Sequence, residues 1–160
     1  MNNFHKGYAS EKEFCKELFF RFGRQPISAT KEEDIYCHWD WKVQNFKYDV
    51  KSKASVNRGQ DAQDKYIWVE FVNVRGRKGW LFGDADFIAF DRGRFWTIVG
   101  RQKLVDVLSE LVDWSEFLDY GNEKKPYKMY QREGRQDGVM LIPWLCAIKT
   151  EPETWWKKKQ

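Results

Sequence analysis

Apolar side chains recur along the chain with two periods, and each period predicts one kind of element. Residues 10–23 place them every three or four positions, as an amphipathic helix does. Ser10 and Glu13 fit a capping box at the start of this helix, and Gly23 fits its end. Residues 102–114 show the same period, so we expect a second helix there.

Aromatic and β-branched residues alternate with polar ones in the rest of the chain, which is the period of a β-strand. Residues 25–34 and 53–65 are polar and lack a period, which indicates connecting loops. The element order indicates an α/β (α+β) fold. The expected strands form a hairpin over residues 37–54, a third strand over 66–74, a second hairpin over 86–99 and a last strand over 139–148.

The first hairpin has an unusual distribution of charge. If residues 44–45 form its turn, residues whose numbers sum to 89 lie opposite each other. Asp40 then faces Asp49 across the hairpin. The next pair outward on the same face is His38 and Lys51, so these four side chains lie together on one face. The other face, which we expect to pack in the core, carries Trp39, Trp41, Tyr48 and Val50.

Two carboxylates that face each other in this way destabilise a hairpin, because the like charges lie about 4.5–5.5 Å apart. A hard divalent cation removes this cost, since Mg²⁺ accepts one or two carboxylates and keeps water or phosphate oxygens as its other ligands. The neighbouring Lys51 would orient or deprotonate an attacking water, or stabilise charge on a phosphoryl oxygen. The alternative is a structural ion-pair lattice in which Lys42, Lys47 and Lys51 neutralise the acids without a metal.

Asp40, followed at short range by Asp49-Val50-Lys51, resembles the motif of the PD-(D/E)XK nuclease superfamily, which includes restriction endonucleases, Holliday-junction resolvases and phage exonucleases. Trp39 stands where the motif has a proline. The resemblance implies a restriction-endonuclease-like core, with a helix, a three-stranded antiparallel meander, a helix and a further strand in a mixed central sheet flanked by helices. It also implies that Asp40, Asp49 and the Val50 carbonyl bind Mg²⁺ or Mn²⁺. Lys51 would position or activate the nucleophile.

Two further acids are candidates for the same site. Resolvase-like members carry a metal-associated Glu on the first helix shortly after a Gly, which matches Gly7 and Glu11. Glu13 is the alternative, and Glu11 also fits an ordinary solvated acid in the first helical turn. Glu70 is the single charge in the third predicted strand, so it either faces solvent or adds to the acidic cluster.

The charge balance permits nucleic-acid binding without demanding it, with 28 Lys and Arg residues against 24 Asp and Glu residues and a net charge of +4. Cations and aromatic rings interleave over residues 121–136, which suits phosphate contacts and base stacking but also an ordinary solvated loop. The same two alternatives hold for Lys53, Arg58 and Lys65. The expected nucleic-acid contacts are Arg75, Arg77, Lys78, Lys128, Arg132 and Arg135.

The expected function is a Mg²⁺-dependent endodeoxyribonuclease that hydrolyses DNA phosphodiester bonds, branched DNA among its candidate substrates. The residues do not distinguish DNA from RNA. The alternative is a nucleic-acid-binding or protein-interaction module that keeps this fold without cleavage. Members of the group often work as dimers, so a homodimer is a further expectation, although no stretch of the sequence identifies an interface.

Length and composition indicate one domain over residues 1–150, followed by a basic aromatic tail over residues 151–160. Three scattered cysteines argue against a zinc site or a disulfide framework. No apolar run approaches 18 residues and no signal-peptide pattern is present, so we expect a cytoplasmic protein without a membrane partner. Residues 29–40, 68–90 and 94–104 are similar to small phage-encoded members of the group, which would place the protein in a host cytoplasm.

Overall fold

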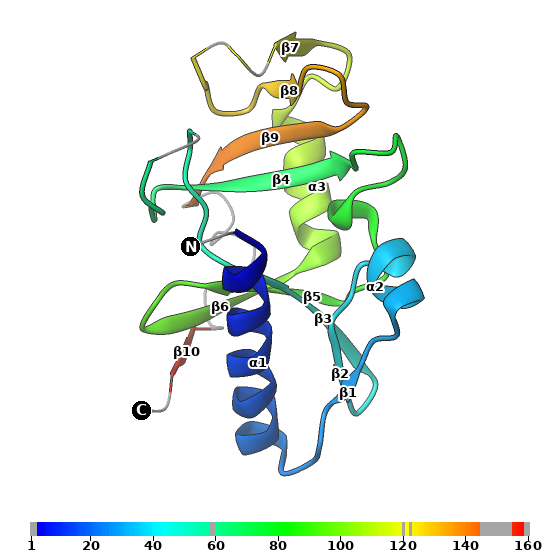
Figure 1. The fold of residues 1–160 in the computed structure, drawn as a ribbon, viewed down its shortest axis with the longest axis vertical. Coiled ribbons are helices and arrows are strands. Elements are labelled where there is room, and N and C mark those ends of the chain that lie inside the picture. The colour runs from blue at the N-terminus through cyan, green and yellow to red at the C-terminus, as the bar shows by residue number, and fades with distance from the viewer. Residues whose placement is uncertain (1–2, 58–59, 120, 122, 145–154, 159–160) are drawn as a thin grey trace.

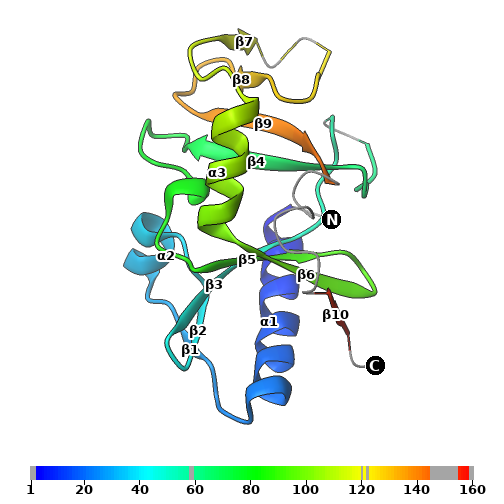
Figure 2. The ribbon, with the colours of Figure 1, turned by 180° about the vertical axis from the view of Figure 1, so that it is seen from behind.

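The computed structural model describes residues 3–57, 60–119, 121, 123–144 and 155–158. They form a mixed α/β fold with two β-sheets, one above the other in Figure 1. Helix α1 (Asn3–Phe22) runs along the lower sheet, and helix α3 (Arg101–Leu111) lies against the upper sheet on the opposite side of the molecule (Figures 1 and 2). The prediction of a mixed α/β protein is confirmed.

Six strands form the lower sheet, in the order β1-β2-β3-β5-β6-β10. Neighbouring strands are antiparallel except for β3 and β5, which are parallel. Both of these central strands are buried over three consecutive residues, so the sheet is covered on both faces there. The strands are β1 (Ile27–Ser28), β2 (Trp41–Val43), β3 (Phe46–Lys51), β5 (Phe87–Asp91), β6 (Phe95–Gly100) and β10 (Trp155–Lys157).

Four strands form the upper sheet, in the order β4-β9-β8-β7. Burial alternates along β4, as its sequence predicts, and Ile67, Val69 and Phe71 face the core. Strands β4 and β9 pair antiparallel, whereas β7 and β8 pair parallel. The strands are β4 (Tyr66–Val72), β7 (Phe117–Asp119), β8 (Met129–Gln131) and β9 (Gly138–Pro143).

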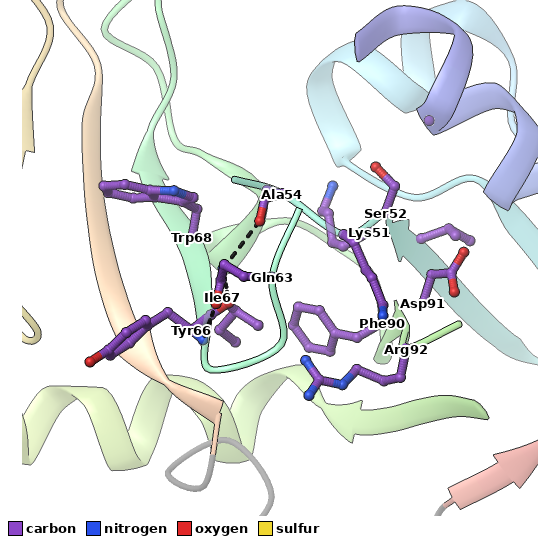
Figure 3. Close-up of a pocket in the computed structure, with 13 residues that line it drawn as sticks. Lys51, Ser52, Ala54, Gln63, Tyr66, Ile67, Trp68, Phe90, Asp91 and Arg92 are labelled. Atoms are coloured by element: carbon purple, nitrogen blue, oxygen red, sulfur yellow. Dashed lines mark hydrogen bonds between the residues drawn. The ribbon is translucent and has the colours of Figure 1, made fainter. Parts of the chain in front are cut away.

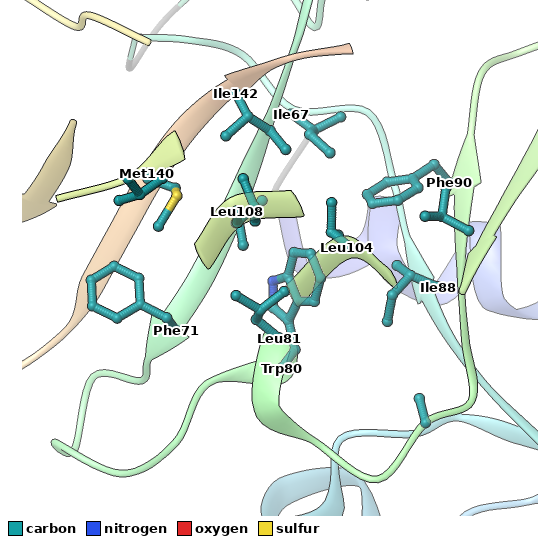
Figure 4. Packing of buried hydrophobic residues seen from close by; sticks show 14 of the residues in the cluster. Ile67, Phe71, Trp80, Leu81, Ile88, Phe90, Leu104, Leu108, Met140 and Ile142 are labelled. Carbon is teal, nitrogen blue, oxygen red and sulfur yellow. The ribbon is translucent and has the colours of Figure 1, made fainter. Parts of the chain in front are cut away.

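Two apolar clusters hold these layers together. The first packs Leu104 and Leu108 of α3 between the upper sheet and Ile88 and Phe90 of β5, so it joins the two sheets (Figure 4). The second packs Phe14 of α1 and its neighbours against the other face of the lower sheet, with Tyr48, Val50 and Trp96. Strands β3 and β5 therefore lie between two cores.

The first helix is longer than its sequence pattern indicates. Because α1 begins at Asn3, the predicted capping box at Ser10 and Glu13 is wrong. Ser10 lies inside the helix, and its hydroxyl donates to Asp91 Oδ2 at 2.9 Å. Gly23, with φ of 61°, ends the helix as predicted, since its N–H donates to the Phe19 carbonyl at 2.9 Å.

The predicted loop over residues 25–34 is also wrong, because it contains β1 and the start of helix α2 (Lys31–Cys37). A capping box does occur here, at Thr30 and Glu33. The Glu33 N–H donates to Thr30 Oγ1 at 3.2 Å, and the Thr30 N–H donates to Glu33 Oε2 at 2.9 Å. None of the helix residues is buried, so α2 has no apolar stripe that the sequence could display.

The first hairpin is shorter than predicted, although its register is correct. The observed pairs Trp41–Tyr48 and Lys42–Lys47 each sum to 89. Because α2 extends to Cys37, the strand starts only at Trp41, and the predicted pair of His38 with Lys51 is wrong. His38 has left-handed backbone geometry, with φ of 54°, and its Nε2 donates to the Lys78 carbonyl at 2.9 Å.

The predicted core face of the hairpin is divided between the two apolar clusters. Trp39 packs in the first cluster, whereas Tyr48 and Val50 pack in the second. The third predicted strand exists as β4, but it pairs with β9 in the upper sheet instead of joining the hairpin. The third antiparallel strand beside the hairpin is β1.

The second half of the chain follows the predictions more closely. The hairpin over residues 86–99 forms as β5 and β6, and the helix over 102–114 forms as α3. The last predicted strand is β9, and its expected extension over residues 145–148 lies outside the described residues. Part of the predicted tail forms β10, which pairs with β6, and the Trp156 ring stacks 5.9 Å from the Phe14 ring.

Candidate functional site

Asp40 and Asp49 lie beside each other where β2 and β3 leave the hairpin ladder. The regular ladder ends at the Trp41–Tyr48 pair, but the Asp40 N–H still donates to the Tyr48 carbonyl at 2.8 Å. The Asp40 carboxylate turns toward β3, where its Oδ2 accepts a hydrogen bond from the Val50 N–H at 2.6 Å. The backbone of β3 therefore holds the two acids together.

Asp49 is only 3% exposed, although it carries an ionisable side chain. Its Oδ1 accepts a hydrogen bond from Lys51 Nζ at 2.7 Å. With both acids ionised, its buried Oδ2 receives no hydrogen bond from any described residue, whereas a protonated Asp40 can donate to it. Since an unsatisfied buried oxygen is costly, we expect a proton on Asp40, a water molecule or a cation to satisfy this atom.

The pKa shifts agree with this geometry. Burial, and then the charge of Asp49, raise the pKa of Asp40 to about 7, against the opposing effects of Lys51 and the Val50 N–H. Burial also raises the pKa of Asp49, which Lys51 opposes. Burial disfavours the Lys51 ammonium, but Asp49 and Asp40 outweigh it and raise the pKa of Lys51. The metal-free site therefore takes up a proton near neutral pH, which a bound cation would displace.

Helix α1 brings Glu11 toward this site and turns Glu13 away. Burial, followed by the charges of Asp40 and Asp34, raises the pKa of Glu11, and the charge of Lys51 lowers it. Glu13 instead pairs with Lys158 Nζ at 2.7 Å. Of the two acids that the sequence leaves as alternatives, Glu11 is the one near the Asp40–Asp49 pair.

Glu70 approaches the site from the upper sheet. Burial raises its pKa, while Lys51, His38 and Arg132 lower it, in that order of effect. In the part of the chain that the structure describes, no three acidic, His or Cys side chains are close enough to share one metal ion. Glu11 and Glu70 thus stand back from the pair. Two carboxylates with carbonyl or water oxygens are nevertheless a sufficient ligand set for Mg²⁺.

Lys42 and Lys47, the next pair toward the turn on the face that carries the acids, do not neutralise Asp40 and Asp49. Lys47 Nζ lies 5.2 Å from the centre of the Trp39 ring, and it faces Lys42 across the ladder. Among the described residues, Asp49 forms its ion pair with Lys51, and neither Lys42 nor Lys47 pairs with Asp40 or Asp49. Of the three lysines in the predicted ion-pair lattice, the described structure therefore pairs only Lys51 with one of the two acids.

A groove of about 860 Å³, which we call the sheet-face groove, opens along the outer face of β4. Its walls include the loop over residues 52–57 after β3 and the turn between β8 and β9. It contains one of the candidate acids and two of the predicted cations. Its lining includes Lys53, Trp68, Glu70, Trp80, Arg132 and Arg135.

A smaller hollow of about 240 Å³ lies on the other side of the same loop, at the ends of β3 and β5 (Figure 3). Lys51 and Arg92 are among its lining residues. The Gln63 side-chain amide fixes the loop by donating to the carbonyls of Ala54 at 3.1 Å and Tyr66 at 2.9 Å. The sequence indicates only an unpatterned polar segment here, so these contacts and the two hollows are not visible in it.

The structure separates the six cations predicted to contact nucleic acid. Arg132 and Arg135 line the sheet-face groove, and Arg132 also pairs with the buried Asp137. Lys128 pairs with Glu116 at 3.0 Å, away from the groove lining. Tyr130 is fully buried and its hydroxyl accepts a hydrogen bond from the Lys125 N–H at 2.6 Å, so this ring is not exposed for base stacking, which was one of the two alternatives for residues 121–136.

The basic turn after β4 does not line either hollow. Arg75 is exposed there. The Arg77 guanidinium lies 5.1 Å from the centre of the Tyr36 ring, and Lys78 Nζ lies 3.3 Å from Asp84 Oδ1. Lys53, by contrast, lines both hollows and was one of the candidates in the polar loop, whereas Arg58 lies outside the described residues.

Comparison with known proteins gives no relative from which a function could be transferred. No protein-family model matches the sequence, and no curated protein and no solved structure matches the chain. Among the described residues, no helix has both the length and the apolar character that crossing a membrane requires. The function therefore has to be inferred from the site itself.

Proposed function

We propose that this protein is a divalent-metal-dependent nuclease that hydrolyses phosphodiester bonds in DNA. The observation that carries the proposal is the carboxylate pair of the partly buried Asp40 and the buried Asp49, with Lys51 Nζ 2.7 Å from Asp49. Asp49 Oδ2 has no donor among the described residues when both acids are ionised, and a cation would satisfy it. Two acids and a lysine around one metal ion suit phosphodiester hydrolysis.

The order of elements supports a restriction-endonuclease-like core. Helix α1 is followed by the antiparallel strands β1, β2 and β3, with Asp40 just before β2 and with Asp49 and Lys51 on β3. The chain departs from the core pattern twice, first where α2 interrupts the meander between β1 and β2 and again after β3. It reaches the parallel strand β5 through β4 and the short 3₁₀ helix η1 (Trp80–Phe82), where the pattern has an α-helix.

The ligand set fits Mg²⁺ or Mn²⁺. Asp40, Asp49 and the Val50 carbonyl would hold the ion, with Glu11 as an outer acid, and all of these donors are hard oxygens. A bound ion would supply positive charge to the phosphoryl oxygens and favour ionisation of the attacking water. Asp40 has to lose its proton before it can serve as a ligand, so metal affinity falls as the pH drops below about 7.

Lys51 acts as a cation in this proposal and not as a base. Despite burial, its carboxylate neighbours raise its pKa, so the ammonium has no lone pair with which to accept a proton from water. It therefore orients the substrate phosphate or stabilises charge on a phosphoryl oxygen. Its side chain is 29% exposed and its Nζ lies 5.3 Å from the Trp80 ring, which lines the sheet-face groove.

The second candidate is a nucleic-acid-binding module on the same fold that does not cleave. The position of Arg132 and Arg135 favours it, because they line the groove without contacting Asp40 or Asp49 in the described structure. The two candidates differ in one respect only, which is whether the Asp40–Asp49 pair has a chemical task. That difference can be measured.

The test is a cleavage assay on plasmid, single-stranded DNA, a four-way junction and an RNA strand, each with Mg²⁺, Mn²⁺ or EDTA. We expect cleavage that requires the metal and that falls at least about 100-fold in Asp49→Asn and Lys51→Met proteins whose fold is verified by circular dichroism. Cleavage that survives both substitutions or EDTA would contradict the proposal. Binding without any cleavage would favour the second candidate.

A further inference from the structure

The sheet-face groove lies beside Lys51, although Lys51 itself lines the smaller hollow. Glu70 and Trp80 line the groove, and both are neighbours of Lys51. Lys51 Nζ lies 5.3 Å from the centre of the Trp80 ring, and the charge of Lys51 acts on Glu70. A polymer held in the groove would therefore pass next to the Asp49–Lys51 pair.

Three cations from two segments meet in this groove. Lys53 follows β3 and its Nζ pairs with Asp64 at 2.8 Å, while Arg132, on the turn between β8 and β9, pairs with the buried Asp137. Arg135, on the same turn, is exposed. Glu70 and Glu133 also line the groove, so three cations stand against two carboxylates in its lining. Two cations held in place by ion pairs and a third that is exposed can contact successive phosphates of a strand.

Trp68 supplies a fixed aromatic ring between these cations. It is partly exposed on the outer face of β4, and its indole N–H donates to the Ser55 carbonyl at 3.0 Å. Its ring meets the Tyr130 ring edge to face, with the ring centres 6.3 Å apart and an interplanar angle of 79°. A partly exposed tryptophan whose orientation is set by two contacts can stack on an unpaired base of any identity.

The dimensions of the site favour an unpaired strand over a duplex. A volume of about 860 Å³ lies in the range of sites for ligands of modest size, which corresponds to a few nucleotides and not to a double helix. Asp49 is only 3% exposed, so a phosphate has to approach a recessed site. A stacked duplex could do so only if it were deformed, whereas a single strand bends at little cost.

We propose that the sheet-face groove binds a single strand of nucleic acid, so that the substrate is unpaired beside the bond that is cut. The inference rests on the proposed nuclease function for the place of cleavage. Binding itself requires neither the metal nor the reaction. The two can therefore be tested separately.

The binding test is fluorescence anisotropy in EDTA, with a labelled single-stranded oligonucleotide and the same sequence closed into a hairpin duplex. We expect the single strand to bind at least about tenfold more tightly than the duplex. Arg135→Glu should weaken its binding about tenfold or more. The matched control is Arg94→Glu, which makes the same charge change at an exposed position on the β5–β6 turn and should change affinity less than about twofold.

A second variant tests the stacking step independently of charge. Trp68→Leu should weaken single-strand binding about fivefold or more, and Trp68→Phe, which keeps an aromatic ring, should restore most of it. The inference is overturned if the duplex binds as tightly as the strand. It is also overturned if Arg135→Glu and Arg94→Glu have equal effects, which would indicate attraction to net charge alone.

The outcomes also separate this inference from the nuclease proposal. Selective single-strand binding that Arg135→Glu abolishes, without cleavage by the wild type, would sustain the groove and contradict the nuclease. Metal-dependent cleavage of fully paired DNA, with binding unaffected by Arg135→Glu, would sustain the nuclease and contradict the groove.

Discussion

Strands β3 and β5 lie next to each other in parallel register, yet they consist of different kinds of residue. A strand that is covered on both faces normally carries a near-continuous apolar run. Strand β5 does so with its segment Phe87-Ile88-Ala89-Phe90. Strand β3 places Asp49 opposite Ile88 and Lys51 opposite Phe90.

The difference between β3 and β5 shows where the sequence departs from the apolar residues that a strand covered on both faces favours. Asp49 is 3% exposed and its partner Ile88 is 0% exposed, so the two positions offer nearly the same burial. A buried ion costs several kcal/mol before any partner compensates it, whereas a buried isoleucine stabilises the fold. Departures of this kind are expected at functional sites. The contrast between β3 and β5 therefore points to the candidate site without reference to any motif.

The largest expected effect comes from substituting the two paired residues, Ile88 and Asp49, one at a time. Ile88→Ala should lower the free energy of unfolding by about 2–5 kcal/mol, because it leaves a cavity in the first apolar cluster. Asp49→Asn, measured above the pKa of Asp40, should lower it by less, because it loses the ion pair with Lys51 but also removes one of two neighbouring carboxylates. Urea unfolding in EDTA measures both. Equal losses in the two variants would mean that Asp49 serves the fold.

The second-largest expected effect is a pH dependence of the free energy of unfolding that comes from Asp40. The pKa of Asp40 is about 7 in the folded protein against an ordinary value of 3.8, so below pH 7 the folded state holds a proton that the unfolded chain has released. This contribution is complete below the unfolded pKa and is lost as the pH rises through the folded pKa. From about pH 5 to pH 8, the metal-free wild type should lose about 2–3 kcal/mol more stability than Asp40→Asn.

Glu11 and Glu70 also have raised pKa values, which act in the same direction, but both proteins in that comparison retain them. The difference between the two unfolding curves therefore reports Asp40 together with its effects on the pKa of Glu11 and of Asp49. Parallel curves for the wild type and Asp40→Asn would contradict a raised pKa at this position.

Metal binding should raise the free energy of unfolding, because the cation compensates the carboxylates beside β3. Mg²⁺ at roughly 30 times its dissociation constant should raise the free energy of unfolding of the wild type by about 2 kcal/mol, above the pKa of Asp40. Asp49→Asn should lose this gain. Asp106→Asn, which removes an exposed carboxylate from α3, should keep it. The same gain in all three proteins would indicate non-specific binding to the surface.

The smallest effect distinguishes the two acids of α1. Glu11→Gln should weaken Mg²⁺ binding roughly tenfold, or about 1.4 kcal/mol, because it removes an outer charge near the pair. Glu13→Gln should leave Mg²⁺ affinity unchanged, since Glu13 pairs with Lys158 on the other side of the helix. Isothermal titration calorimetry measures both affinities. An equal loss of Mg²⁺ affinity in the two variants would contradict the assignment of Glu11 to the site.

The strongly periodic parts of the chain could be predicted from the sequence. Helix α3, strand β4 and the β5–β6 hairpin display their apolar faces directly, and the turn at residues 44–45 fixes the register that brings Asp40 to Asp49. Helix α2 could not be found in this way, because it buries no residue. The Ser10–Glu13 pattern misplaced the start of α1, because the helix begins seven residues earlier, at Asn3.

Strand pairing between distant segments was the other feature that could not be predicted from the sequence. No local pattern indicates that β4 pairs with β9, about 70 residues later, and thereby leaves the first hairpin. The sheet-face groove depends on that pairing, since it combines the loop after β3 with the turn between β8 and β9. The carboxylate pair and Lys51 could be predicted because they lie within one hairpin. The groove beside them could not.

The central claim is that the Asp40–Asp49 pair binds a divalent cation. Electron paramagnetic resonance of Mn²⁺ tests this claim most directly. The titration uses the wild type, Asp49→Asn and Asp106→Asn above the pKa of Asp40, with Mg²⁺ as competitor. We predict one Mn²⁺ site that Mg²⁺ displaces, present in the wild type and Asp106→Asn and absent in Asp49→Asn. A wild type that binds no Mn²⁺, or an Asp49→Asn protein that binds it equally well, would contradict the claim.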